Sequence, residues 1–126
     1  MEGGQNLKVS KADQDMINRY ARGYAKMQEI KKEVGAYTNE IENCEEAENE
    51  VMLLDDEDSK AIPMKIGEAF IHMDSEEVDE QLKDATTQAK LNLSIKQKAL
   101  DKLVVELEGL KKTLYSKFGE AINLDE

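Results

Sequence analysis

The chain has 126 residues, of which 36% are charged and only 5% are aromatic, with no Trp, one Pro and one Cys. A formal net charge of −11 argues against nucleic-acid binding, because contacts to phosphates need a basic surface. No stretch approaches the roughly 18–20 apolar residues of a membrane-spanning helix. A single Cys forms no internal disulfide, which fits a reducing, cytoplasmic setting. We therefore expect one domain over residues 1–126, with residues 1–10 as a disordered lead-in.

A long helix is predicted for residues 11–53. Ser10-Lys11-Ala12-Asp13 fits a capping box in which Asp replaces the usual Glu or Gln. Beyond it, core positions recur in alternating steps of four and three, the 3.5-residue period of a coiled coil, with Gly23 and Glu48 as the two weak points. These positions are Met16, Tyr20, Gly23, Met27, Ile30, Val34, Tyr37, Ile41, Cys44, Glu48 and Val51.

A β-hairpin is predicted for residues 61–73, where the hydrophobic period changes to two. Gly67-Glu68 fits a two-residue turn between strands at residues 61–66 and 69–73. An isolated two-stranded hairpin is at best marginally stable in water, and this one is apolar on both faces. We therefore expect it to pair with strands of other chains. Ile62, Met64 and Ile66 share one face of the first strand, and Phe70 lies on the face opposite Ile71 and Met73 in the second.

A second helix is predicted for residues 75–118, with Asp74 or Ser75 as its N-cap and Gly119 as a left-handed C-terminal residue. Its core positions are Val78, Leu82, Ala85, Ala89, Leu93, Leu100, Leu107 and Leu114, with Leu103 and Leu110 between them. Residues 119–126 form a tail. Because the two helices have nearly equal length, the predicted fold class is all-α dominated: a long antiparallel two-helix coiled coil joined by one β-hairpin.

Charge is distributed unevenly along the chain. Residues 35–59 carry ten acids and no base, whereas residues 88–117 carry seven Lys and three acids. In an antiparallel pair of helices, this predicts an acidic hairpin end and a mildly basic free tip. Solvated coiled-coil flanks explain most such charges individually. Their segregation would still bias which partner meets which end.

The tip also carries more apolar residues than two coiled-coil stripes can bury. We expect the surplus to be partly exposed, and exposed apolar patches mark interaction sites. The alternative is that they pack between the helices in a slightly different register. The surplus consists of residues outside the core positions, Ile17, Tyr24, Tyr115 and Phe118, and of Ile122 and Leu124 after the helix.

Residues that carry chemistry are isolated in this sequence. His72 is the only histidine, and Cys44 lies at a core position, where a thiol behaves as a small apolar group. Asp55-Asp56-Glu57-Asp58 lacks the ligand spacing and the glycine of an EF-hand loop. We therefore predict a non-enzymatic protein with no catalytic residue, no cofactor and no metal site.

The chain resembles the prefoldins, and within them a β-type subunit, which has one hairpin where the α-type has two. Three segments carry the resemblance: Val51–Asp56 before the acidic loop, the hairpin Ile62–Ile71 with its Ile-Pro start, and Leu114–Leu124. The heptad body by itself is unspecific. The similarity extends over almost the whole chain from Asp13 onward.

This resemblance implies an ATP-independent chaperone subunit in a heterohexamer of α- and β-type subunits. The hairpins of such subunits join into β-barrels, and the coiled-coil tips capture unfolded actin and tubulin for the cytosolic chaperonin. It also implies that the hairpin residues Ile62, Met64, Ile66, Phe70 and Ile71 belong to the assembly platform. The candidate client-contact residues that it implies at the tip are Met16, Ile17, Tyr20, Tyr24, Tyr115, Phe118, Ile122 and Leu124. The alternative is a coiled-coil scaffold or adaptor for one specific folded partner.

Overall fold

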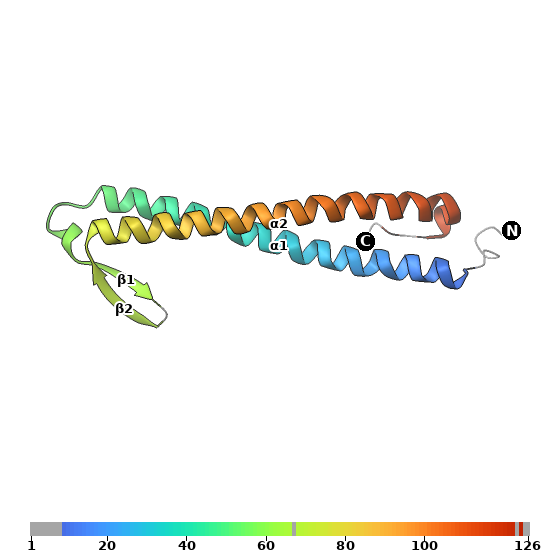
Figure 1. Cartoon of the computed structure of the whole chain (residues 1–126), viewed down its shortest axis with the longest axis horizontal. Coiled ribbons are helices and arrows are strands. Elements are labelled where there is room, and N and C mark those ends of the chain that lie inside the picture. Colours follow the sequence, from blue (N-terminus) through green and yellow to red (C-terminus); the bar gives the residue numbers. More distant parts are fainter. Residues whose placement is uncertain (1–8, 67, 123, 125–126) are drawn as a thin grey trace. The chain divides into compact units, whose positions relative to one another are not determined.

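The computed structural model describes residues 9–66, 68–122 and 124, without the side chains of Ile66 and Glu120. The elements follow in the order α1 (Lys11–Met52), the 3₁₀ turn η2 (Asp58–Lys60), β1 (Ile62–Ile66), β2 (Ala69–Met73), α2 (Ser75–Phe118) and the 3₁₀ turn η3 (Gly119–Ala121) (Figure 1). Two long helices packed against each other and one antiparallel hairpin confirm the predicted fold class.

The chain divides into two compact units, each of which contains parts of both helices. The hairpin unit comprises residues 33–95, and the terminal unit comprises residues 1–32 and 96–126. Each unit has its own cluster of buried apolar side chains. We therefore describe each unit by itself.

Both helices begin with reciprocal capping boxes. The Ser10 hydroxyl accepts from the Asp13 N–H at 3.0 Å, and the Asp13 carboxylate accepts from the Ser10 N–H at 3.2 Å. At α2, the Asp74 carboxylate accepts from the Glu77 N–H at 2.9 Å, and the Glu77 carboxylate accepts from the Asp74 N–H at 3.5 Å. These bonds satisfy backbone donors that have no partner within the helix. The predicted capping box is confirmed, and Asp74 rather than Ser75 caps α2.

The core of the terminal unit brings the beginning of α1 against the end of α2. Tyr20 lies 7% exposed against Leu107 and Leu114, and Leu114 is fully buried. Farther along the helices, Ile30 and Leu100 are also buried at predicted core positions. The 3.5-residue period therefore identified the side chains that face the partner helix.

Gly23 is not a weak point of this core. A Cβ atom at Gly23 would lie 2.7 Å from Cδ2 of Leu107, closer than carbon atoms pack. The missing side chain thus makes room for Leu107, which is 5% exposed. A small residue at a core position lets the facing leucine fill the space.

The hairpin unit packs one face of the β-hairpin on its helices. The ladder pairs Ile62 with Met73 and Met64 with Ile71, so these four side chains share a face. Ile62, Met64 and Met73 contact the buried cluster of this unit, which consists of Cys44, Val78 and Leu82. The predicted strands are confirmed, while Gly67 of the predicted turn lies outside the described residues.

After α2 the chain reverses direction (Figure 1). Gly119 adopts a φ of 58°, the left-handed conformation that was predicted for it and that costs a residue with a Cβ atom about 1–2 kcal/mol. The reversal returns Ile122 and Leu124 to the apolar cluster of the terminal unit. A third segment thereby joins the two helices at this end.

Candidate functional site

The β-hairpin combines open strand edges with exposed apolar side chains. Within the described residues, β1 and β2 pair with each other alone, so each strand has a free edge. Phe70 is 67% exposed and Ile71 is 47% exposed. Open strand edges next to large exposed apolar side chains are a template for pairing with another chain.

The strand register makes one edge a better hydrogen-bonding partner than the other. Pro63 lies opposite His72, and Pro has no N–H to donate, so this is a non-hydrogen-bonded pair whose backbone groups face outward. Because the two kinds of pair alternate, Lys65 and Phe70 also direct their backbone groups outward. The outer edge of β2 therefore offers N–H and C=O groups at both Phe70 and His72, whereas the edge of β1 lacks the donor at Pro63.

The predicted assembly residues differ in their surroundings. Ile62 and Met64 are half-buried on their own helices, Phe70 and Ile71 are exposed, and the side chain of Ile66 lies outside the described residues. One apolar face of the hairpin is therefore partly covered within the chain. Ile62 and Met64 contact the cluster of Val78 and Leu82, whereas Ile71 on the same face is exposed.

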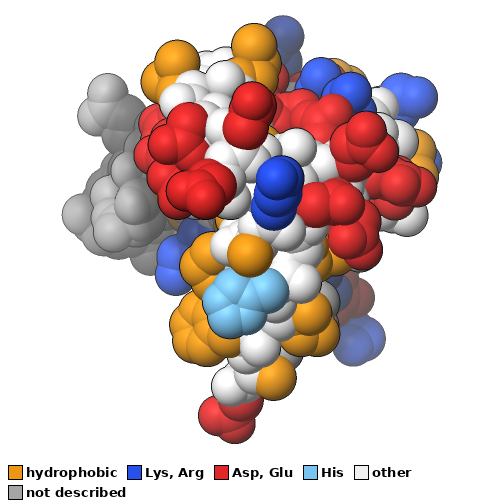
Figure 2. Space-filling view, turned by 90° about the vertical axis from the view of Figure 1, so that its left-hand side faces the viewer, with side chains coloured by type: hydrophobic (Ala, Val, Ile, Leu, Met, Phe, Trp, Pro, Cys, Tyr) orange, Lys and Arg blue, Asp and Glu red, His pale blue; other side chains and the backbone are white. Residues whose placement is uncertain are grey.

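The hairpin unit is strongly acidic. It carries 18 acidic and four basic residues, a formal charge of −14, whereas the terminal unit carries 10 acidic and 13 basic residues, a formal charge of +3. Figure 2 shows acidic side chains gathered above the hairpin and apolar side chains around the single histidine. The predicted segregation of charge therefore coincides with the division of the chain into two units.

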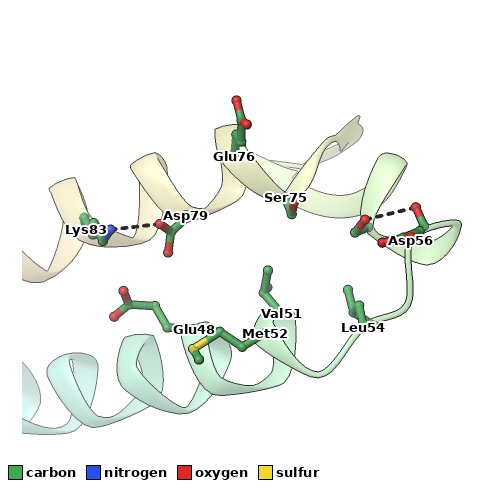
Figure 3. Close-up of a pocket in the computed structure, with 10 residues that line it drawn as sticks. Glu48, Val51, Met52, Leu54, Asp56, Ser75, Glu76, Asp79 and Lys83 are labelled. Carbon is green, nitrogen blue, oxygen red and sulfur yellow. Dashed lines mark hydrogen bonds and ion pairs between the residues drawn. The ribbon is translucent and has the colours of Figure 1, made fainter.

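An open groove of about 520 Å³ lies between the end of α1, the following loop and the start of α2. Figure 3 shows Glu48 and Val51 of α1 and Asp79 of α2 directed into this space. Lys83 bridges to Asp79 at 2.9 Å, and this hydrogen bond and charge raise the pKa of Lys83 above its ordinary value. Met52 and Leu53, where α1 passes into the loop, are 79% and 86% exposed. The sequence pattern did not predict this exposure.

The terminal unit buries more of its apolar residues than expected. Phe118 and Leu124 are each 8% exposed, so the expectation of partial exposure is wrong for them, whereas Tyr20, at 7%, is buried as its core position predicted. The reason is the chain reversal at Gly119, which adds a third segment to the cluster. The other candidates are half-buried against the same cluster: Met16, Ile17, Tyr24, Tyr115 and Ile122.

An ion pair joins the two helices at this end. Lys117 of α2 donates to the carboxylate of Asp13, which is 3% exposed and also belongs to the capping box of α1. The hydrogen bond from Lys117 and the backbone N–H of Ser10 lower the pKa of Asp13. Sequence reasoning found the cap but missed the ion pair, because the two residues lie 104 positions apart.

The residues that carry chemistry remain apart in the structure. Cys44 is a buried free thiol beside Val78 and Leu82, and His72 is exposed on β2. Across residues 9–66, 68–122 and 124, no group of three His, Cys, Asp or Glu residues is arranged to hold a metal ion. In the same ranges, no helix combines the length and apolar content that crossing a membrane requires.

Comparisons with known proteins agree on one family. A model of the family described as "Prefoldin subunit" matches residues 14–121. A protein of Caenorhabditis elegans named "Probable prefoldin subunit 4" is 41% identical over 121 residues, covering 96% of each chain. "Prefoldin subunit 4" of Homo sapiens is 33% identical over 96% of this chain and 90% of the human one. "Prefoldin subunit 4" of Saccharomyces cerevisiae is 32% identical over 95% and 92% of the two chains.

These matches extend over both helices and the hairpin, and thus over every surface described above. They confirm the resemblance that the hairpin and the C-terminal segment indicated. Prefoldin subunits are non-enzymatic chaperone components, in agreement with the isolated position of His72 and Cys44. The chain belongs to the prefoldin subunit family.

Proposed function

We propose that the chain is a single β-type domain that acts as an ATP-independent chaperone subunit in a heterohexamer of α- and β-type prefoldin subunits. The observation that carries this proposal is the hairpin, which has two free edges and exposes Phe70 and Ile71. Sequence similarity over almost the whole chain to proteins named prefoldin subunit 4 supports the same role.

Assembly is proposed to occur through the outer edge of β2. That edge has a complete set of backbone donors and acceptors, and Phe70 and Ile71 stand on opposite faces of the same strand. A strand from another subunit would pair with the backbone while its neighbours cover these two side chains. The acid-rich surroundings favour partners whose facing surface is basic.

Client capture is proposed for the terminal unit. It holds many large apolar residues and a formal charge of +3, and its half-buried Met16 supplies the adaptable surface that suits varied partners. Captured proteins are proposed to be unfolded actin and tubulin, passed on to the cytosolic chaperonin in the cytoplasm. Neither nucleotide, metal nor other cofactor takes part.

The test is to reconstitute the hexamer with this chain lacking residues 1–17 and 118–126. Native mass spectrometry should still find the full complex, because the hairpin unit is intact. Suppression of aggregation of diluted, chemically unfolded actin should weaken, because the truncation removes Met16, Ile17 and Phe118 of the terminal apolar cluster. If capture stays unchanged while one folded partner is lost, the chain is an adaptor and the chaperone proposal is wrong.

A further inference from the structure

The chain reversal in the terminal unit places one residue in a small, well-defined site. Leu124 is 8% exposed and belongs to the same buried cluster as Tyr20, Leu114 and Phe118. Its side chain is thus surrounded by groups from both helices. Ile122, two positions earlier, is half-buried against the same cluster.

Two tyrosine hydroxyls hold the backbone of Leu124 from opposite helices. Tyr20 of α1 donates its O–H to the Leu124 carbonyl at 3.4 Å, and Tyr115 of α2 accepts from the Leu124 N–H at 3.3 Å. Backbone contacts of this kind are independent of sequence, while an apolar pocket selects the type of side chain. The arrangement is that of a binding site for one aliphatic residue in an extended peptide.

The terminal unit also contains a small hollow on its surface. This hollow of about 200 Å³ shares Tyr20 and Leu107 with the cluster around Leu124. It is also lined by apolar side chains of both helices, Met27 and Val104 among them, and by the charged side chains of Glu108 and Lys111.

The contacts of the returning segment are weak enough to be replaced. Both hydrogen bonds are longer than the 2.7–3.2 Å typical of N–H···O bonds, and O–H···O bonds are usually shorter still. The segment reaches the site only through the left-handed conformation of Gly119. Among residues 119–122 and 124, its secondary structure is the 3₁₀ turn Gly119–Ala121.

We infer that the Tyr20–Tyr115 site binds an aliphatic residue of an extended, unfolded polypeptide, and that Ile122 and Leu124 are its resident occupant until a client displaces them. This inference rests on the proposed capture of clients by the terminal unit. The inference predicts two opposite roles at this end of the chain. The segment after Phe118 competes with clients, whereas the residues of the Tyr20–Tyr115 site bind them.

A direct test uses a fluorescent peptide with the sequence of residues 119–126. It should bind the full chain poorly and should bind a chain that ends at Phe118, as measured by anisotropy. Unfolded actin should compete for the same site. Failure of the peptide to bind the shortened chain would overturn the inference, and so would binding that unfolded actin does not reduce.

Point variants test competition without shortening the chain. In the reconstituted hexamer, Leu124→Ser should lower the concentration needed to suppress aggregation of unfolded actin by about threefold to tenfold, because the binding-competent fraction rises. Gly119→Ala should act in the same direction, since it strains the reversal and leaves the cluster side chains in place. Val105→Ser, at a 71% exposed position of the same unit, is the matched control. Equal or weaker suppression by Leu124→Ser would contradict the inference.

Hydrogen exchange separates this inference from the proposed function. The Leu124 amide is bonded to Tyr115 and should exchange faster when unfolded actin is added. If exchange does not change while the chain without residues 1–17 and 118–126 loses capture, the inference fails and the proposed function stands. If hexamers that contain the intact chain do not suppress aggregation of unfolded actin, the proposed function itself fails.

Discussion

The two units of the chain differ in how far they bury their large apolar side chains. In the terminal unit, large side chains such as Tyr20, Leu114 and Phe118 are buried in one cluster. In the hairpin unit, the buried cluster is Cys44, Val78 and Leu82, while large side chains on the hairpin and its approach are exposed. The exposed ones include Met52, Leu53, Phe70 and Ile71.

This difference shows where the chain depends on other molecules. The terminal unit closes its own core by adding a third segment to two helices. The hairpin unit cannot do so, because a two-stranded sheet leaves a backbone edge open on each side even when one face is covered. We therefore expect substitutions in the terminal unit to change stability, and substitutions on the hairpin to change assembly.

The largest effect on stability is expected for Leu114→Ala in the terminal unit. Leu114 is fully buried, and removing a buried leucine side chain costs about 2–5 kcal/mol. Urea unfolding of the full chain, followed by circular dichroism, should show the loss. Val105→Ala, at a 71% exposed position, should stay within about 0.5 kcal/mol of the parent. Equal effects of the two substitutions would mean that this cluster is not a core.

Phe70→Ala should separate assembly from stability. A central aromatic residue of an interface contributes about 2 kcal/mol or more, so we expect roughly 30-fold weaker incorporation into the hexamer. The unfolding midpoint of the isolated chain should not change, because Phe70 is 67% exposed. Leu91→Ala, at a 55% exposed position on α2 in the same unit, is the control for a general loss of apolar surface. Native mass spectrometry of a titration gives the comparison, and normal incorporation of the Phe70 variant would refute the proposed interface.

Asp13→Asn should weaken the terminal unit in a pH-dependent way. Lys117 lowers the pKa of Asp13 below its ordinary value of 3.8, so the charged carboxylate stabilises the folded chain fully above that pH. The contribution is lost as the pH falls through the lower pKa of the folded state. The melting temperature of the variant should therefore lie below that of the parent at pH 7, and the difference should vanish in strong acid.

Asp15→Asn is the matched control for this titration. Asp15 is an exposed carboxylate on the same turn of α1. Its replacement should leave the melting temperature near that of the parent throughout. A difference for Asp13→Asn that persists in strong acid would show that lost packing, not lost charge, explains the effect.

The smallest change in stability is expected when either of two glycines of the terminal unit is replaced by Ala. Gly109→Ala should stabilise the chain by up to about 1 kcal/mol, because Ala favours the helix and nothing lies within 4 Å of its Cβ. Gly23→Ala should gain much less, since its Cβ would lie 2.7 Å from Leu107 and the leucine must move. Differential scanning calorimetry would detect this difference, and equal gains would mean that Gly23 makes no special room.

Local patterns in the sequence predicted the elements well. Ser10 and Asp13 predicted the start of α1, and Gly119 predicted the end of α2. These signals work because caps and left-handed glycines act within a few residues of each other. The hydrophobic period was equally informative, since it selects the side chains that face a partner helix before the partner is known.

The candidate sites were predicted less completely. Phe70 and Ile71 are exposed as expected, but Ile62 and Met64 are covered by helices of their own unit. The ion pair of Asp13 with Lys117 had no sequence signal, because its partners are joined only by the antiparallel packing of the helices. The client-contact residues remain a proposal, and the burial of Phe118 and Leu124 is the main correction.

The sequence by itself determined the order of helix, hairpin and helix, the registers that face inward and the separation of charge along the chain. These properties follow from the spacing of apolar and charged residues, which any short window displays. Only the tertiary structure decided that the chain turns back at Gly119 and seats Leu124 between Tyr20 and Tyr115. That outcome depends on contacts between groups up to 104 positions apart in the sequence. Local sequence patterns do not predict such contacts, because they extend over only a few residues.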